Sequence, residues 1–286
     1  MPPHDHRPAG RIHMRLIIAL IIAIVGIIGY IGKRSVNPTT GETQYVSLSP
    51  DQEIALGLQA APEMAQQMGG VVPKSDPSAA MVQKIGQRLV QSSDAIKSPY
   101  VKSFDFHLLN DDRTINAFAL PGGQIFITRA LYEKLENEAQ LAGVLGHEIG
   151  HVIHRHAAEH MAKGELGGML ATAVGVGASD ERGRGMGAAV AAQMANQVIQ
   201  LKFGRDDENE SDDYGLRYMV QAGYQPSAML KVMEVLRDAS GGGGRTPEIL
   251  ATHPAPQSRL EAINAKIQKM SAEGATGQLT EGAPLP

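Results

Sequence analysis

The chain contains no cysteine and no tryptophan, and only 4% of its 286 residues are aromatic. The absence of cysteine excludes a disulfide scaffold, a thiolate zinc finger, a cysteine nucleophile and lipid attachment through an N-terminal cysteine. It does not fix the redox compartment, because a protein without thiols can fold in any of them. Hydrophobic residues still make up 43% of the chain, which is enough to build a core.

Positive charge is scarce outside the N-terminal region. Residues 1–35 hold five Lys or Arg and one Asp, for a charge of +4. The remaining 251 residues hold 21 Lys or Arg and 29 Asp or Glu, for a charge of −8. This acidic body argues against a protein that binds nucleic acid.

A long apolar run near the N-terminus, Leu16 to Gly32, contains 17 residues without a charge. A helix of this length measures about 25 Å, the short end of a transmembrane span. The alternative is a cleaved signal peptide, but Tyr30 or Lys33 would then lie three residues before the cleaved bond, which fits poorly. We therefore predict an uncleaved signal anchor. The three arginines before it favour a cytoplasmic N-terminus and a body on the other side of the membrane.

The rest of the chain shows one domain with short flanking segments. We divide the chain into a leader (1–15), a signal-anchor helix (16–32), a linker (33–48), one domain (49–272) and a disordered tail (273–286). Capping residues and hydrophobic spacing predict helices that begin at Ser49-Pro50 and Asp76-Pro77, and others over 138–161, 206–222, 227–239 and 258–270. Alternation predicts a strand over 104–108, and residues 115–120 and 124–128 flank Pro121-Gly122-Gly123 as in a hairpin, although 117–120 also fits an extended loop. The Gly- and Ala-rich residues 164–190 read either as two weak helices around a lid or as a plain surface excursion.

A histidine-rich segment carries the clearest chemical motif. Residues 147–151 read HEIGH, which fits the pattern H-E-x-x-H. On a helix, His147 and His151 lie on one face, so both imidazoles can bind one metal ion, and zinc accepts such ligands. Glu148 then lies where it can take a proton from a water molecule that the metal activates.

The two histidines leave such a site incomplete, because a catalytic zinc usually has three protein ligands. Position 154 is His rather than Gly and position 157 is Ala, so the motif does not continue as H-E-x-x-H-x-x-G-x-x-H. We expect a carboxylate from another helix, and residues 206–213 offer six acids in eight positions. Glu208 and Asp212 share a helix face by their i,i+4 spacing, but the chemistry alone does not choose among the acids. Asp206 and Asp207 fit a solvated helix N-terminus.

A family resemblance selects among these acids. HEIGH followed by ENESDDYG resembles the HExGH … ExxxD-xx-G signature of the HtpX / CaaX-prenyl-protease family of zinc metallopeptidases, in which the third ligand is glutamate. The resemblance implies one zinc ion held by His147, His151 and Glu208. It implies Glu148 as the base and Asp212 as an orienting or proton-donating residue. This chain has Ser211 where the family usually has Ala.

Two further residues match the segment THPAPQSRL, which also resembles the family. His253 either caps a loop before Pro254 or, as in some relatives, approaches the zinc and keeps the enzyme latent. Arg259 either stabilises the oxyanion of the tetrahedral intermediate or forms a structural salt bridge.

The remaining candidates depend on how the domain folds. His154 lies near the metal-facing side and could support a ligand, whereas His156 and His160 fall off that face and suit packing or solvent. The strand Gln124, Ile125, Phe126, Ile127, Thr128 is expected to be an exposed edge strand that pairs with an extended peptide substrate, rather than a plain sheet strand.

Together these observations predict an α+β, zincin-like fold that is mostly helical, with a small sheet beside the active-site helix and one N-terminal transmembrane helix. The expected function is zinc-dependent endopeptidase activity on extended or misfolded envelope proteins. The alternative is a zinc-stabilised periplasmic chaperone or assembly factor with latent proteolysis. The resemblance to single-span or secreted envelope members places the protein in a bacterial inner membrane with its domain in the periplasm or cell exterior, or in the periplasm after signal cleavage. The oligomeric state stays open.

Overall fold

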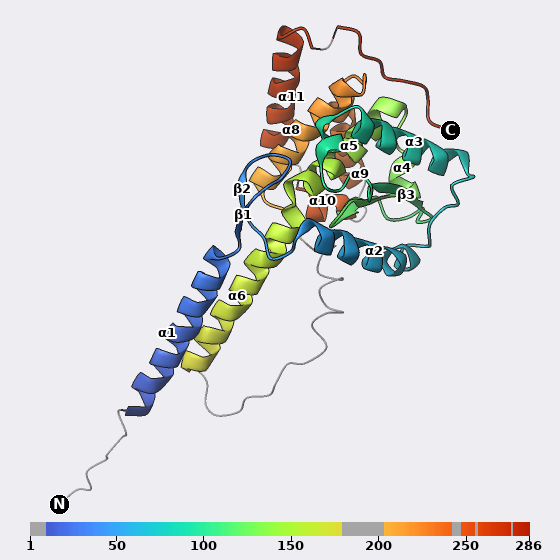
Figure 1. Cartoon of the computed structure of the whole chain (residues 1–286). Coiled ribbons are helices and arrows are strands. Elements are labelled where there is room, and N and C mark those ends of the chain that lie inside the picture. The colour runs from blue at the N-terminus through green and yellow to red at the C-terminus, as the bar shows by residue number, and fades with distance from the viewer. Residues whose placement is uncertain (1–9, 179–202, 242–246, 255–256, 276) are drawn as a thin grey trace, which may run out of the picture.

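The computed structural model describes residues 10–178, 203–241, 247–254, 257–275 and 277–286. A mostly helical body surrounds a small sheet, and a pair of helices extends away from it (Figure 1). This arrangement confirms the predicted α+β fold with an apolar N-terminal helix.

The elements follow one another along the chain in this order: α1 (Gly10–Ile31), β1 (Arg34–Val36), β2 (Thr43–Tyr45), α2 (Pro50–Gln67), α3 (Pro77–Gln91), the 3₁₀ helix η1 (Asp94–Lys97), β3 (Asp105–Leu109), β4 (Ala117–Leu120), β5 (Gln124–Thr128), α4 (Arg129–Tyr132), α5 (Glu138–His154), α6 (His156–Ala178), α8 (Arg205–Gln221), α9 (Ala228–Gly241), α10 (Glu248–Thr252) and α11 (Gln257–Ala272). The helix starts predicted from Ser49-Pro50 and Asp76-Pro77 are those of α2 and α3. The predicted capping box is present, because the Ser49 hydroxyl accepts from the Gln52 N–H.

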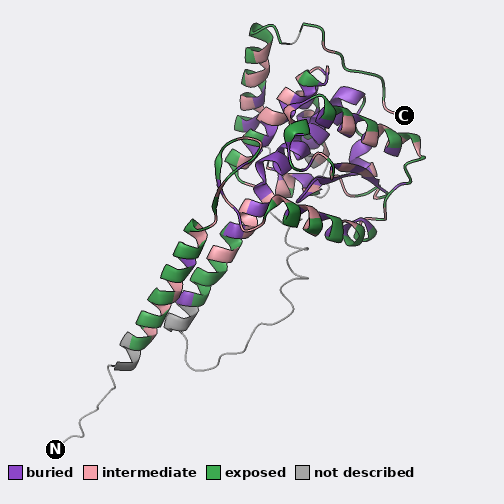
Figure 2. Cartoon of the chain, in the orientation of Figure 1, coloured by how far each residue is buried: buried purple, intermediate pink, exposed green. Residues whose placement is uncertain are grey.

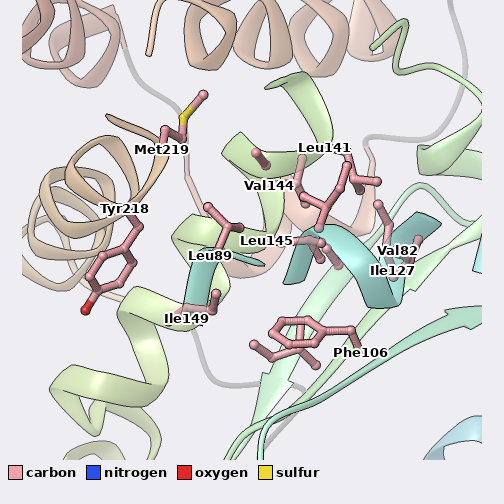
Figure 3. Packing of buried hydrophobic residues seen from close by; sticks show 14 of the residues in the cluster. Val82, Leu89, Phe106, Ile127, Leu141, Val144, Leu145, Ile149, Tyr218 and Met219 are labelled. Carbon is pink, nitrogen blue, oxygen red and sulfur yellow. The ribbon is translucent and has the colours of Figure 1, made fainter. Parts of the chain in front are cut away.

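Helix α5 is the centre of the body, and all 17 of its residues are buried (Figure 2). Its N-terminus is capped by the Asn137 side chain, which accepts from the Gln140 N–H at 3.0 Å. Around it, apolar side chains of α3, β3, β5 and α8 form one core (Figure 3). Packing on every side holds α5 rigid, and this matters because α5 carries the HEIGH motif.

The helix predicted over residues 138–161 is in fact two helices that meet at Arg155. Arg155 adopts a left-handed conformation with φ of 61°, which is uncommon for a residue with a Cβ. Its Nε donates to Glu53 Oε1 at 2.8 Å, and Tyr100 donates to the other oxygen of that carboxylate at the same distance. This buried ion pair offsets the backbone strain and turns α6 away from the axis of α5.

The three-stranded sheet has the order β3-β5-β4. Strand β5 is parallel to β3 on one side and antiparallel to β4 on the other. The prediction that residues 124–128 form an exposed edge strand is therefore wrong. All five residues of β5 are buried, as expected for a central strand, and β4 lies at the edge of this sheet.

The two flanking segments are more ordered than the sequence predicted. The expected linker over 33–48 contains the hairpin β1–β2, from which Asn37 donates to the Ile153 carbonyl at 2.8 Å and Gln44 donates to the His154 carbonyl. The expected disordered tail over 273–286 packs along the start of α5, where the N–H groups of Glu138 and Ala139 donate to carbonyls of the tail at 3.0 and 2.9 Å. These hydrogen bonds hold both segments against the body. The predictions of a plain linker and of a disordered tail are therefore both corrected.

The structure describes part of the Gly-rich segment. Helix α6 continues without a break to Ala178, which replaces the first of the two weak helices predicted there. The remainder of this segment, residues 179–190, for which a lid and a surface loop were both open, lies outside the described residues.

Candidate metal centre

Helices α5 and α8 approach each other closely because small residues face one another. A Cβ atom on Gly150 would lie 2.8 Å from the Ser211 Cα, and one on Gly215 would lie 3.0 Å from the backbone nitrogen of His147. Either distance is too short for an ordinary contact, so these positions require glycine unless the helices move apart. The close approach carries the Glu208 side chain of α8 to the histidines of α5.

Donor atoms of four side chains converge between these helices and the loop after α10. His147 Nε2 lies 3.0 Å from His151 Nε2 and 3.6 Å from Glu208 Oε2, and His151 Nε2 lies 3.5 Å from Glu208 Oε1. His253 Nδ1 lies 3.4 Å from His147 Nε2 and 2.9 Å from Glu208 Oε1. The structure thus brings together the three ligands that the resemblance implied and adds His253 as a fourth donor.

The spacing of these donors fits a tetrahedral metal ion. Nitrogen and oxygen ligands at about 2.0–2.1 Å from zinc in tetrahedral geometry are separated from each other by about 3.3–3.4 Å. The distances between the donor atoms, 2.9 to 3.6 Å, bracket that value. Two imidazoles and a carboxylate are also ordinary zinc ligands, so both the geometry and the chemistry of the set suit such an ion.

The donors are buried, and their surroundings set the protonation of His151 and Glu208. The four side chains are exposed by 6% or less. Burial lowers the pKa of His151 well below its usual value, which favours the neutral ring that a metal requires. Burial opposes ionisation of Glu208, but the charge of His253 and a hydrogen bond with His151 outweigh it and lower the pKa of Glu208. Its carboxylate is therefore ionised.

Asp212 and Arg259 hold the site in place. Asp212 Oδ1 accepts from His147 Nδ1 at 2.9 Å, which leaves Nε2 of His147 free to face the metal position. Arg259 donates to both oxygens of Asp212, from Nε at 2.7 Å and from Nη2 at 2.8 Å, and its Nη1 pairs with Glu208. Although burial opposes ionisation, the Arg259 guanidinium lowers the pKa of Asp212. Of the two roles left open for Arg259, this geometry favours the salt bridge.

Glu148 lies beside the donor set without joining it. Its side chain is 1% exposed, and Oε1 has no hydrogen-bond partner among the residues that the structure describes. His253 Nε2 lies 3.8 Å from that oxygen. A buried carboxylate oxygen without a partner is costly, and a water molecule in the centre would satisfy it.

One supporting residue was missed from the sequence. His156 is 2% exposed, and its Nδ1 lies 2.9 Å from Nδ1 of the ligand His151, while its Nε2 lies 3.1 Å from Glu210 Oε2. The turn at Arg155 places His156 beside the ligand His151. Residue spacing along one continuous helix could not predict this contact. His154 faces Glu210, at 3.2 Å, and is not one of the four donors. His160 pairs with Asp207.

Hollows adjoin the centre on more than one side. A narrow cleft lies between the end of β4 and α5, and Ala119, Leu120, Pro121, His151 and Phe203 are among the residues that line it. On the other side, a small and largely apolar pocket is lined by His147, Glu148 and the side chains Met229, Val232, Met233, Leu236 and Ile249. The donor set therefore lies between an edge strand and an apolar pocket.

A buried helix with H-E-x-x-H, a glutamate from a second helix and an α+β fold together define a metallopeptidase. The comparison with protein families agrees, since the family described as "Peptidase family M48" matches residues 77–267. The chain belongs to peptidase family M48. The finer assignment to the HtpX / CaaX-prenyl-protease type stays a prediction.

Curated relatives are themselves proteases. The chain is 33% identical over 239 residues to the "Beta-barrel assembly-enhancing protease" of Escherichia coli (strain K12), covering 82% of this chain and 47% of that protein. It is 33% identical over 255 residues to the protein of the same name from Yersinia pestis, covering 85% and 49%. Identity to "Mitochondrial metalloendopeptidase OMA1" of Saccharomyces cerevisiae is 27% over 249 residues, covering 81% and 68%. The chain thus spans about half the length of these bacterial relatives.

Proposed function

We propose that this chain is a zinc-dependent endopeptidase that hydrolyses peptide bonds of extended or misfolded proteins in the bacterial envelope. The observation that carries the proposal is the cluster of four buried donor side chains that could hold one metal ion, with the carboxylate of Glu148 beside it, one oxygen of which has no hydrogen-bond partner among the described residues. The names of the relatives support proteolysis, and the envelope is supported by the apolar helix α1.

Zinc bound here would polarise the scissile carbonyl and lower the pKa of the attacking water. Glu148 takes the proton of that water and passes it to the leaving amine. Asp212 fixes the ring of His147 through Nδ1 and keeps its Nε2 directed at the ion. Arg259 neutralises the excess negative charge of Asp212 and Glu208, so the carboxylates stay ordered in a buried site.

The substrate is proposed to bind as an extended strand beside β4. This strand forms the edge of the sheet, and its last residues line the cleft next to His151. Backbone pairing with β4 would align a peptide without demanding much sequence. The apolar pocket next to Glu148 then favours a large aliphatic or aromatic side chain near the cleaved bond.

The substitution Glu148→Gln tests the mechanism. It removes the base but no donor, so the variant should bind zinc like the wild type and lose cleavage of an unfolded protein such as casein by at least about a hundredfold. Zinc content is measured by elemental analysis, and Glu208→Ala serves as the variant that should lose both zinc and cleavage. Cleavage by Glu148→Gln near the wild-type rate would refute the role of Glu148.

His253 favours a second candidate function, a zinc-stabilised assembly factor or chaperone with latent proteolysis. Its Nδ1 lies among the donors, where it would fill the position that a substrate carbonyl needs. His253→Ala should then increase cleavage of casein and weaken zinc binding. If wild-type and His253→Ala proteins are both inactive toward casein while preventing aggregation of an unfolded protein, the assembly factor is the better description.

We propose a bacterial inner membrane as the location, with α1 as a single anchor and the peptidase domain in the periplasm. The basic residues that precede the apolar run support this orientation.

A further inference from the structure

Helix α1 does not stand alone. Its residues Met14–Ile31 have a mean hydropathy of 2.6, and only 6% of these residues are buried, so most of its apolar side chains are exposed. Helix α6 runs beside it, and the two project together from the body (Figure 1). Their contact is direct, since a Cβ atom on Gly26 would lie 3.3 Å from the Met169 side chain and 3.6 Å from that of Leu166.

The outer half of α6 is as unsuited to water as α1. Residues 166–178 contain no charged side chain. Met169 and Leu170 are 44% and 36% exposed, in a part of the molecule where most described residues are exposed (Figure 2). The inner half of the same helix, by contrast, carries His160, Lys163 and Glu165.

In α1 and α6 the change from polar to apolar residues occurs at positions that lie side by side. Lys33, just after the end of α1, forms an ion pair with Glu165 of α6, and the Ser47 hydroxyl donates to the same carboxylate at 3.2 Å. Tyr30 stacks on Tyr45 next to this point, with ring centroids 5.0 Å apart. Tyrosine rings and charged residues of this kind mark the boundary of a bilayer.

We propose that residues 166–178 of α6 lie within the hydrocarbon layer of the membrane beside α1, so that the partner of this apolar surface is lipid. Thirteen residues rise about 20 Å, which is less than the hydrocarbon thickness of about 30 Å, so the described part of α6 enters the bilayer without crossing it. The inference rests on the proposed membrane anchor and does not depend on peptidase activity.

This placement of α6 also sets the distance between the metal centre and the bilayer surface. The part of α6 between His156 and Glu165 contains ten residues and rises about 15 Å. The donor set at the end of α5 would therefore sit within about 20 Å of the bilayer surface. Substrates would then meet the site close to the membrane surface.

The absence of cysteine from the chain allows a clean test of this placement. Single cysteines are introduced as Met169→Cys, Leu170→Cys and, on the other side of the boundary, Lys163→Cys. All are made in the Glu148→Gln chain, so the outcome is independent of cleavage. The full-length proteins are inserted in lipid vesicles with the domain outside and treated with a charged maleimide, before and after denaturation in SDS. We expect Lys163→Cys to react in intact vesicles, and Met169→Cys and Leu170→Cys to react at least about tenfold more slowly until SDS is added.

Equal reaction of Met169→Cys and Lys163→Cys in intact vesicles would overturn the proposal, and protection of Lys163→Cys would overturn the boundary at Glu165. A second measurement uses the absence of tryptophan. Brominated lipid should quench the fluorescence of Met169→Trp and leave that of Lys163→Trp unchanged. Equal quenching of the two, or none, would also refute the membrane placement.

Discussion

Replacing Gly150 with alanine perturbs the closest contact between the two helices that build the metal centre. The new Cβ would lie 2.8 Å from the Ser211 Cα and 2.9 Å from its carbonyl oxygen. To restore an ordinary contact of 3.4 Å, helix α8 would have to move by about 0.6 Å. Overpacking of this kind costs about 1–3 kcal/mol, whereas alanine gains about 1 kcal/mol over glycine in a helix. The net loss of stability is therefore at most about 2 kcal/mol, and the variant should still fold.

The effect on metal binding should be larger than the effect on folding. Glu208 lies one turn before Ser211 on α8, so movement of the helix displaces its carboxylate from His147 and His151. We expect zinc affinity to fall about tenfold, the lower end of what changes in the support of a metal site cost. Competition with a fluorescent chelator gives the affinity, and thermal unfolding of the metal-free protein gives the stability.

Gly164→Ala is the matched control, because a Cβ there would meet no atom of another described segment within 4 Å. It should keep the wild-type zinc affinity and gain up to about 1 kcal/mol of helix stability. If Gly150→Ala binds zinc as tightly as Gly164→Ala, the close approach of α5 and α8 does not set the geometry of the site, and the reasoning fails.

Two further substitutions test the groups that support the ligands. Because Arg259 lowers the pKa of Asp212, the stability that this carboxylate contributes is present above about pH 4 and is lost as the pH falls through the lowered pKa. Asp212→Asn should thus flatten the fall in unfolding free energy of the metal-free protein below about pH 4, measured by urea denaturation, and an unchanged slope would contradict the assignment. His156→Ala should weaken zinc binding about tenfold, because His151 loses the partner of its Nδ1. His160→Ala should leave zinc affinity unchanged, and equal losses for the two variants would assign the effect to general loosening of α6.

The parts of the site that could be predicted are those set by local geometry. HEIGH places His147 and His151 on one helix face whatever the rest of the chain does. Glu208 was different, because six acids in eight positions are chemically alike and only a family signature distinguished it. The structure shows what the spacing could not, namely that Gly150 and Ser211 let the helix of Glu208 come close enough.

The predictions failed where contacts between segments that are distant in the sequence determine the structure. The interruption of the helix at Arg155 depends on Glu53, which lies 102 residues away in the sequence. No local sequence pattern therefore predicts it. The position of residues 124–128 just before the metal-binding helix favoured an edge strand that pairs with substrate. The central place of β5 instead results from its parallel pairing with β3, which precedes it in the sequence by way of β4. The apolar residues on both faces of β5 were a usable sign of a central strand, since half-exposed strands alternate.

Segments from opposite ends of the chain form hydrogen bonds with the two ends of helix α5. The hairpin over 33–48 binds the last carbonyls of α5, and the tail over 273–286 binds its first N–H groups. Both of these segments lie outside residues 77–267, the part that matches the family. A fragment trimmed to that range would keep every metal ligand and yet leave the terminal backbone groups of the metal-binding helix without these partners. The part of the chain that is recognisable as a peptidase is therefore smaller than the part that must fold together to hold the peptidase site.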